Sequence, residues 1–194
     1  MGVSYARNGL DIKYPRVGVL NVGTEQHKGR AELKEAHALI ASRADDANFE
    51  FVGFVEGGDI PGTKCDVIVT DGFTGNIALK TGEGTANLIG KLLREAFAYT
   101  PLSRLASLLA LTSMRRLKKR IDPRRVNGGV FLGLNGTVVK SHGSADATGV
   151  SSAVKLAFHL AQSDFSKKVA ARVASTPTLA QDEAKRSEKT GEQE

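Results

Sequence analysis

Polar and charged side chains gather in a glycine-bounded loop at residues 140–146, inside the stretch GGVFLGLNGTVVKSHGSAD at 128–146. A packed core has no use for such a cluster. An anion site does, because glycine lets backbone amides approach an oxyanion closely while lysine and histidine supply charge-assisted donors. The loop provides three catalytic candidates, Lys140, His142 and Ser144, and three anion-binding candidates, Ser141, Gly143 and Asp146.

A second polar segment, DGFTGN at 71–76, lies where an apolar run gives way to a helical pattern. The amides of its last three residues would point outward with the helix dipole behind them, which is a geometry that binds anions. Alternatively, Asp71 or Thr74 only caps the helix and the glycines only turn the chain. The candidates here are Asp71, Gly72, Thr74 and Gly75 for phosphate binding, Asn76 for catalysis, and Lys80 one helical turn later.

Two further polar loops follow apolar runs, NVGTEQHKG at 21–29 and VEGGDIPG at 55–62. Ligands of open α/β sheets bind at the carboxyl ends of the strands. Three parallel strands that each end in a polar glycine loop would therefore build one shared cleft. Asn21 and Lys28 join the phosphate-binding candidates on this argument.

The elements that position these loops follow from short β-branched or aromatic runs and from helical periodicity. A strand, a helix and a second strand form a βαβ unit, which predicts an α/β fold with a parallel sheet. Asn135-Gly136 is a strong two-residue turn signal between two further strands. We expect strands at 16–22, 49–55 and 64–70, and helices at 28–43, from 71 toward 99, at 102–120 and at 146–162.

Composition narrows the class of protein. With 194 residues, 41% of them hydrophobic, the chain is long enough for one well-buried domain. The single cysteine excludes a disulfide framework, and no Cys or His cluster has metal-ligand spacing, so we expect no metal. The N-terminal residues lack the apolar core of a signal peptide, and no run of about 18 apolar residues occurs. These features predict a cytoplasmic protein.

Two nucleotide motifs fail. GTANLIGKL at 84–92 has one residue too many between its glycines for a P-loop, and Leu92 stands where the metal-binding Ser or Thr would be. GEGTAN places Asn87 at the third glycine of a dinucleotide fingerprint. Neither ATP nor NAD is supported, and we expect no cofactor.

The net charge of +6 is unevenly placed. Residues 91–125 contain ten basic side chains against two acidic ones, so the rest of the chain sums to −2. Two apolar stripes at helical spacing precede the cluster RRLKKR at 115–120, and most such stripes are core. Apolar residues followed by a basic cluster also suit a helical pair on an anionic bilayer. Nucleic-acid binding is the weaker interpretation, because the cluster contains no aromatic residue or recognition motif.

Four segments, NVGTEQHKG, VEGGDI, DVIVTDGFTGNIALKT and GLNGTVVKSHGSAD, resemble the motifs of the bacterial PlsX-type phosphate acyltransferase family, in the same order. The resemblance implies transfer of a fatty acyl group from acyl carrier protein to inorganic phosphate, giving acyl phosphate for phospholipid synthesis. It also implies a three-layer fold similar to phosphotransacetylase and isocitrate dehydrogenase, and a homodimer. Peripheral attachment to the inner face of the membrane, through the protruding helical pair at 88–120, is implied as well.

Members of that family are longer and begin with a domain whose glycine-rich motif, DAMGGD, has no counterpart in this chain. We therefore expect residues 1–165 to be the C-terminal portion of the acyltransferase domain, incomplete at the N-terminus. A polar tail is expected at 166–194, of low complexity from about Ser175. Two alternatives stay open: a catalytically inactive module that binds a membrane or a protein, and a nucleic-acid-binding segment.

Overall fold

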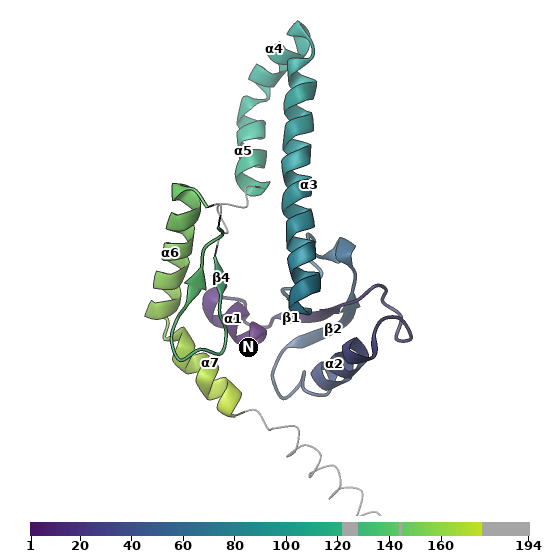
Figure 1. Ribbon diagram of the computed structural model, residues 1–194, viewed down its shortest axis with the longest axis vertical. Coiled ribbons are helices and arrows are strands. Elements are labelled where there is room, and N and C mark those ends of the chain that lie inside the picture. The colour runs from purple at the N-terminus through teal and green to yellow at the C-terminus, as the bar shows by residue number, and fades with distance from the viewer. Residues whose placement is uncertain (122–127, 144, 176–194) are drawn as a thin grey trace, which may run out of the picture.

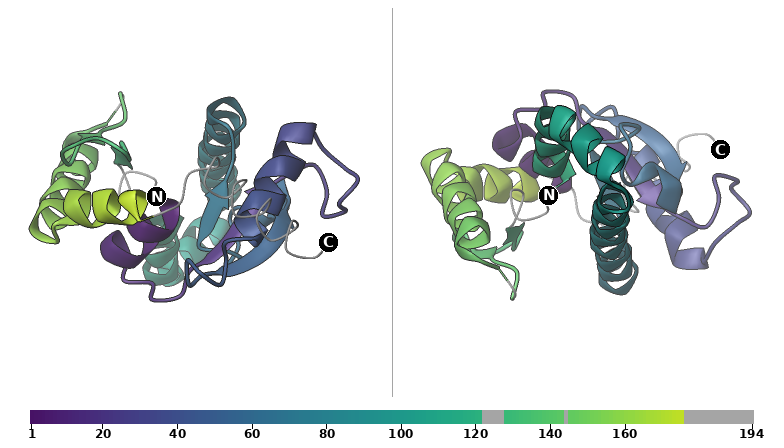
Figure 2. Two further views of the ribbon diagram at one scale, coloured as in Figure 1. Left: turned by 90° about the horizontal axis from the view of Figure 1, so that it is seen from below. Right: turned by 90° about the horizontal axis from the view of Figure 1, so that it is seen from above.

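The computed structural model describes residues 1–121, 128–143 and 145–175, with the side chains of Lys118 and Ile121 left out. In Figure 1 a small parallel sheet lies at the lower right, further helices lie on the left, and one long helix rises above the sheet. The views from below and above in Figure 2 keep these two parts on opposite sides of the N-terminal helix. The protein is α/β, as predicted.

The first part is a three-stranded parallel sheet of β1 (Arg16–Leu20), β2 (Glu50–Val55) and β3 (Val67–Val69), in the order β2-β1-β3. The register pairs Arg16 with Glu50 and Leu20 with Val55, with an irregularity after Val17 where Val52 is the extra residue. Gly53 follows it with a φ of 79°, a backbone conformation that glycine adopts without strain. The three predicted strands and their parallel direction are confirmed.

Helix α2 (Ala31–Ala41) makes the crossover between β1 and β2 and packs on both strands. Its His37 ring lies 4.8 Å from the ring of Phe51 and 4.5 Å from that of Phe54. The predicted βαβ unit is therefore confirmed. A short 3-10 helix, η1 (Gly57–Asp59), follows β2 at the same edge of the sheet as the loops after β1 and β3.

The second part contains α1 (Gly2–Gly9), α6 (Ala147–Gln162), α7 (Phe165–Ala174) and the antiparallel pair β4 (Gly129–Val130) and β5 (Val139–Lys140). Its core contains Leu160, Phe165 and Val169, with Tyr5 of α1 packed against them. Helix α6 agrees with the prediction. Helix α7 occupies the start of the expected tail, because Phe165 and Val169 are apolar residues that α1 and α6 bury. Residues 176–194 lie outside the described residues.

The predicted two-residue hairpin at Asn135-Gly136 is wrong. The paired residues are Gly129 with Lys140 and Val130 with Val139, so eight residues, 131–138, separate the two strands. One further hydrogen bond, from Phe131 N to Val138 O, extends the pairing before the chain opens into a wider loop. The local turn signal did not decide the connection, because strands this short leave few ladder bonds to enforce a tight turn.

A long helix, α3 (Gly72–Ala98), rises from the sheet, and α4 (Pro101–Leu109) turns the chain at its far end. The expected single helix at 102–120 is in fact two, because α4 ends at Leu109 and α5 (Leu111–Ile121) starts after Ala110. Neither α3 nor α4 has a buried residue, although both are rich in leucine. The apolar stripes of this helical pair are therefore exposed and are not core in this structure. None of the helices in the described ranges is long and apolar enough to cross a membrane.

Candidate functional site

Asn21 organises the loop that follows β1. Its side chain is only 6% exposed, and its amide nitrogen donates to the carbonyl oxygens of Gly23 (3.1 Å) and Lys28 (3.2 Å). Gly29 has a φ of 85°, and a Cβ there would lie 2.0 Å from Asn21 Oδ1. Asn21, predicted to bind phosphate, is thus buried and holds the two ends of this loop together.

Lys28, a second predicted phosphate ligand, pairs with a carboxylate of its own loop. Its Nζ lies 2.7 Å from Oε1 of Glu25. The hydrogen bond that Lys28 donates to this carboxylate raises the pKa of Lys28, so the side chain stays an ammonium. Lys28 stands at the strand-end edge of the sheet as predicted, and phosphate binding by it stays a prediction.

Asp71 caps helix α3. Its Oδ1 accepts a hydrogen bond from the Thr74 amide at 2.9 Å, its Oδ2 accepts one from the Thr74 hydroxyl at 2.7 Å, and its backbone oxygen accepts one from the Gly75 amide at 2.9 Å. Two of the amides expected to bind an anion are therefore occupied by Asp71 itself. The capping interpretation describes this junction, and phosphate contact by Gly72, Thr74 or Gly75 stays a prediction.

Gly75 is needed for another reason, because a Cβ there would lie 2.9 Å from Cγ2 of Thr70. Arg30, at the start of α2, donates from Nη2 to Oδ2 of Asp71 at 2.8 Å. This ion pair joins the loop after β1 to the loop after β3, as the shared-edge argument predicts. Sequence reasoning missed Arg30, although its position at the end of the glycine loop could have suggested it.

Asp71 should make the stability of the protein depend on pH. The amide and hydroxyl of Thr74, and then Arg30, lower the pKa of Asp71 from 3.8 to about 2. A carboxylate with a lowered folded-state pKa contributes stability above its unfolded pKa, and this contribution is lost as pH falls through the folded value. We expect the melting-temperature difference between wild type and Asp71→Asn to be constant above pH 3.8 and to shrink toward about pH 2.

Thermal unfolding followed by circular dichroism at several pH values measures this difference. Asp46→Asn, in the exposed turn after α2, is the control for the loss of one carboxylate charge. A difference that did not change over the acid range would contradict the capping role of Asp71.

His142 and Lys80 meet across the two parts of the protein. The Nζ of Lys80, on α3, contacts Nε2 of His142, in the loop between β5 and α6, although 62 residues separate them along the chain. Two predicted site residues are thus brought together by the fold. The same lysine donates to Oε2 of Glu83 at 3.0 Å, and that oxygen lies 3.8 Å from His142 Nε2. Glu83 was missed, although it is one helical turn from Lys80.

The remaining candidates lie around this contact in sequence. Lys140 is an exposed residue of β5, and Asn76 is exposed in the first turns of α3. Asp146, an anion-binding candidate, caps α6 by accepting from the Gly149 amide at 3.0 Å, and anion binding by it stays a prediction. Ser144 lies outside the described residues, while Ser141 and Gly143 lie beside His142 in the described part of the loop.

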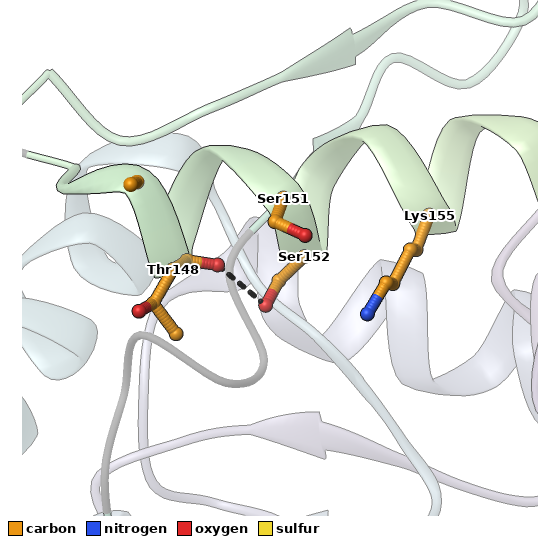
Figure 3. A pocket seen from close by; sticks show the side chains of 5 residues that line it. Thr148, Ser151, Ser152 and Lys155 are labelled. Atoms are coloured by element: carbon orange, nitrogen blue, oxygen red, sulfur yellow. Dashed lines mark hydrogen bonds between the residues drawn. The ribbon is translucent and has the colours of Figure 1, made fainter.

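An open groove of about 570 Å³ runs along the first turns of α6, directly after this loop. Its polar lining residues are Thr148, Ser151, Ser152 and Lys155, drawn in Figure 3. The Ser152 hydroxyl donates to the carbonyl oxygen of Thr148 at 3.0 Å. Hydroxyls and an ammonium repeating at helical spacing suit a polar or anionic group. Sequence reasoning missed this polar face, although the spacing of its residues was visible.

No group of three or more His, Cys, Asp or Glu residues in the described ranges has an arrangement suited to a metal ion. The single thiol, Cys65, is half-buried, and this burial raises its pKa. A raised pKa leaves less thiolate at neutral pH, so Cys65 suits a structural position better than a nucleophilic one.

Comparisons with known proteins agree with the sequence motifs. A family model described as fatty acid synthesis protein matches residues 1–168. Phosphate acyltransferase of Ruegeria pomeroyi is 77% identical over 184 residues, which is 95% of this chain and 50% of that protein. The phosphate acyltransferase of Roseobacter denitrificans is 76% identical over 177 residues, which is 91% of this chain and 50% of that protein. That of Paracoccus denitrificans is 69% identical over 180 residues, which is 93% of this chain and 49% of that protein. The chain spans about half the length of the curated relatives it matches.

Proposed function

Because this chain belongs to the fatty acid synthesis protein family, we propose that it carries the site at which a fatty acyl group passes from acyl carrier protein to inorganic phosphate. The product is an acyl phosphate for phospholipid synthesis. The names of its relatives, phosphate acyltransferases at 69–77% identity, support an acyltransferase. Acyl carrier protein as the donor rests on the motif resemblance.

In the proposed reaction, an oxygen of phosphate forms a bond to the carbonyl carbon of the acyl thioester, and the carbon–sulfur bond breaks. The sulfur leaves as a thiolate, with an ordinary pKa of about 8.5, and takes up a proton from solvent. Phosphate is itself the nucleophile, so the protein needs no covalent intermediate. Its task is to hold phosphate against the thioester and to stabilise the tetrahedral oxyanion between them.

The contact between Lys80 and His142 is the observation that supports this proposal most directly. A cationic donor and an imidazole from different elements converge at one place, beside the glycine-bounded loop. In our proposal Lys140, His142 and Lys80 supply charge and hydrogen-bond donors to the phosphate or the oxyanion. Ser141, Ser144, Asn76 and the Gly143 amide orient the anion. Asp71 and Asp146 only orient their helices, since a carboxylate would repel phosphate.

Phosphate-dependent release of the carrier thiol tests the function. Incubation with an acylated carrier protein should liberate free thiol and form acyl phosphate in equal amounts, and only when phosphate is present. Thiol release that does not depend on phosphate would indicate hydrolysis and would contradict the proposal. The alternative is an inactive module that binds a membrane or a protein. It predicts vesicle binding without thiol release.

We also propose that α3, α4 and α5 attach the protein to the inner face of the membrane from the cytoplasm. The exposed apolar residues of α4 support this, and Leu109 is 86% exposed at its end. The basic residues of α5 follow directly, and near an anionic surface each contributes about 1 kcal/mol. Homodimer formation is a further part of the proposal, which rests on the motif resemblance.

Leu109→Glu should weaken binding to vesicles that contain phosphatidylglycerol by roughly tenfold or more. A fully buried leucine contributes about 1.5–3 kcal/mol, and about 1.4 kcal/mol corresponds to a factor of ten. Sedimentation with vesicles at low and high salt measures the change. The matched control is Val22→Glu, because Val22 is 79% exposed but lies beside the sheet. Equal losses for both variants would contradict attachment through α4.

A further inference from the structure

Glu83 occupies the position from which it can act on both Lys80 and His142. A single carboxylate oxygen, Oε2, lies 3.0 Å from Lys80 Nζ and 3.8 Å from His142 Nε2. The two nitrogens also contact each other, so three groups from two elements meet at one point. All three side chains are between 34% and 51% exposed, so solvent screens them only in part.

The hydrogen inventory of the three groups restricts their protonation. A lysine ammonium only donates, and an ionised carboxylate only accepts. With Lys80 charged, it donates to Glu83 Oε2 and to His142 Nε2, which must then present its lone pair. A neutral His142 ring therefore carries its proton on Nδ1. One ammonium hydrogen of Lys80 remains to reach an anion.

The negative charge of Glu83 is what favours this arrangement. An ammonium that contacts only an imidazole has no fixed acceptor of opposite charge. The hydrogen bond to Glu83 Oε2 at 3.0 Å holds the side chain of Lys80 in one place. Lysine has a long, flexible stem, so a fixed partner reduces the freedom that a substrate would otherwise have to remove.

We propose that Glu83 is a positioning residue of this site. It holds Lys80 as a shared donor between itself and His142, and it thereby fixes His142 in the Nδ1-protonated form. Glu83 does not touch phosphate, since its charge would repel the anion, and it acts through the two residues that do. This inference rests on the proposed function only for its kinetic consequence.

The first test needs no substrate. Nitrogen-15 NMR of the histidine side chains in the full chain distinguishes the two ring tautomers, and His142→Gln assigns the His142 signals among the four histidines. We expect the neutral ring of wild-type His142 to carry its proton on Nδ1. Glu83→Gln keeps the size and an accepting oxygen but loses the charge, so the Nε2-protonated form should appear. Glu83→Asp, which keeps the charge, should restore part of the wild-type spectrum.

The second test separates positioning from folding. Glu83→Gln should lower kcat about tenfold, an effect within the range of coupling energies between contacting groups, without raising the KM for phosphate. Glu95→Gln is the matched control, since Glu95 lies on the same helix and pairs with Lys91 at 3.8 Å, three turns farther from the sheet. It should change neither the kcat nor the His142 spectrum.

A wild-type His142 protonated on Nε2, or a spectrum and kcat that Glu83→Gln leaves unchanged, would overturn the inference. An altered spectrum with an unchanged kcat would also overturn the positioning role. If the wild type shows no phosphate-dependent acyl transfer at all, the proposed function fails. The histidine spectrum then still decides by itself whether Glu83 determines the tautomer of the His142 ring.

Discussion

Replacing His142 with alanine is expected to lower acyl phosphate formation by about 10²–10³-fold, the range found when one preorganised oxyanion donor is removed. His142, in the glycine-bounded loop, contacts Lys80 of α3. Its loss removes a donor and also the contact that holds Lys80 in place. The measurement is kcat for phosphate-dependent thiol release, in a preparation that is active with wild-type sequence.

His159→Ala is the matched control, because His159 is an exposed residue in the last turn of α6. It should leave kcat unchanged. A near-normal rate for His142→Ala would remove this residue from the mechanism. The double variant of His142→Ala and Lys80→Met tests whether the two residues act together. Residues that act as a unit give a double variant whose kcat is hardly lower than that of either single variant. Two independent, multiplying losses would contradict a joint role.

Replacing Leu160 with alanine is expected to lower the free energy of unfolding by about 3–5 kcal/mol. Leu160 is fully buried at 0% exposure, in the cluster with Phe165 and Val169. Its methyl groups join α6 to α7 and α1, so truncation leaves a cavity among three helices. For a domain stabilised by about 5–15 kcal/mol, this is a large fraction of the total. Denaturation in urea, analysed by the midpoint and slope, measures it.

Phe158→Ala is the control for Leu160→Ala. Phe158 is a larger apolar residue on the same helix, but its side chain is 63% exposed. Its truncation should change the unfolding free energy by less than about 1 kcal/mol. Similar losses of unfolding free energy at both positions would show that α7 does not pack on α6 as in this structure. Residues 166–174 would then belong to the polar tail, as the sequence predicts.

Much of the α/β architecture could be read from local pattern. The apolar runs that became β1, β2 and β3 are short and β-branched, and the helix between the first two leaves parallel pairing as the simple solution. Asp71 and Asp146 are strong N-cap residues, and both cap the helices that periodicity indicated. These signals act within a few residues, so they can be recognised without knowledge of the fold.

Three local signals were misleading. Asn135-Gly136 did not close a tight hairpin, the helix expected at 102–120 breaks after Leu109, and α7 forms within the expected tail. For the hairpin and for α7, packing or its absence decided the outcome. The short β4 and β5 enforce no turn, whereas α7 is held by burying Phe165 and Val169 against residues distant in sequence.

By itself, the sequence determined which residue types could do chemistry and that three polar loops would end parallel strands at one edge of the sheet. The tertiary structure alone decided which of those groups meet. Arg30 reaches Asp71 across 41 residues, and Lys80 reaches His142 across 62. Periodicity and capping act over one or two helical turns, whereas contacts of this separation depend on how whole elements pack. For the same reason, the role of Glu83 could not be predicted from the sequence, because it depends on the packing of the loop after β5 on α3.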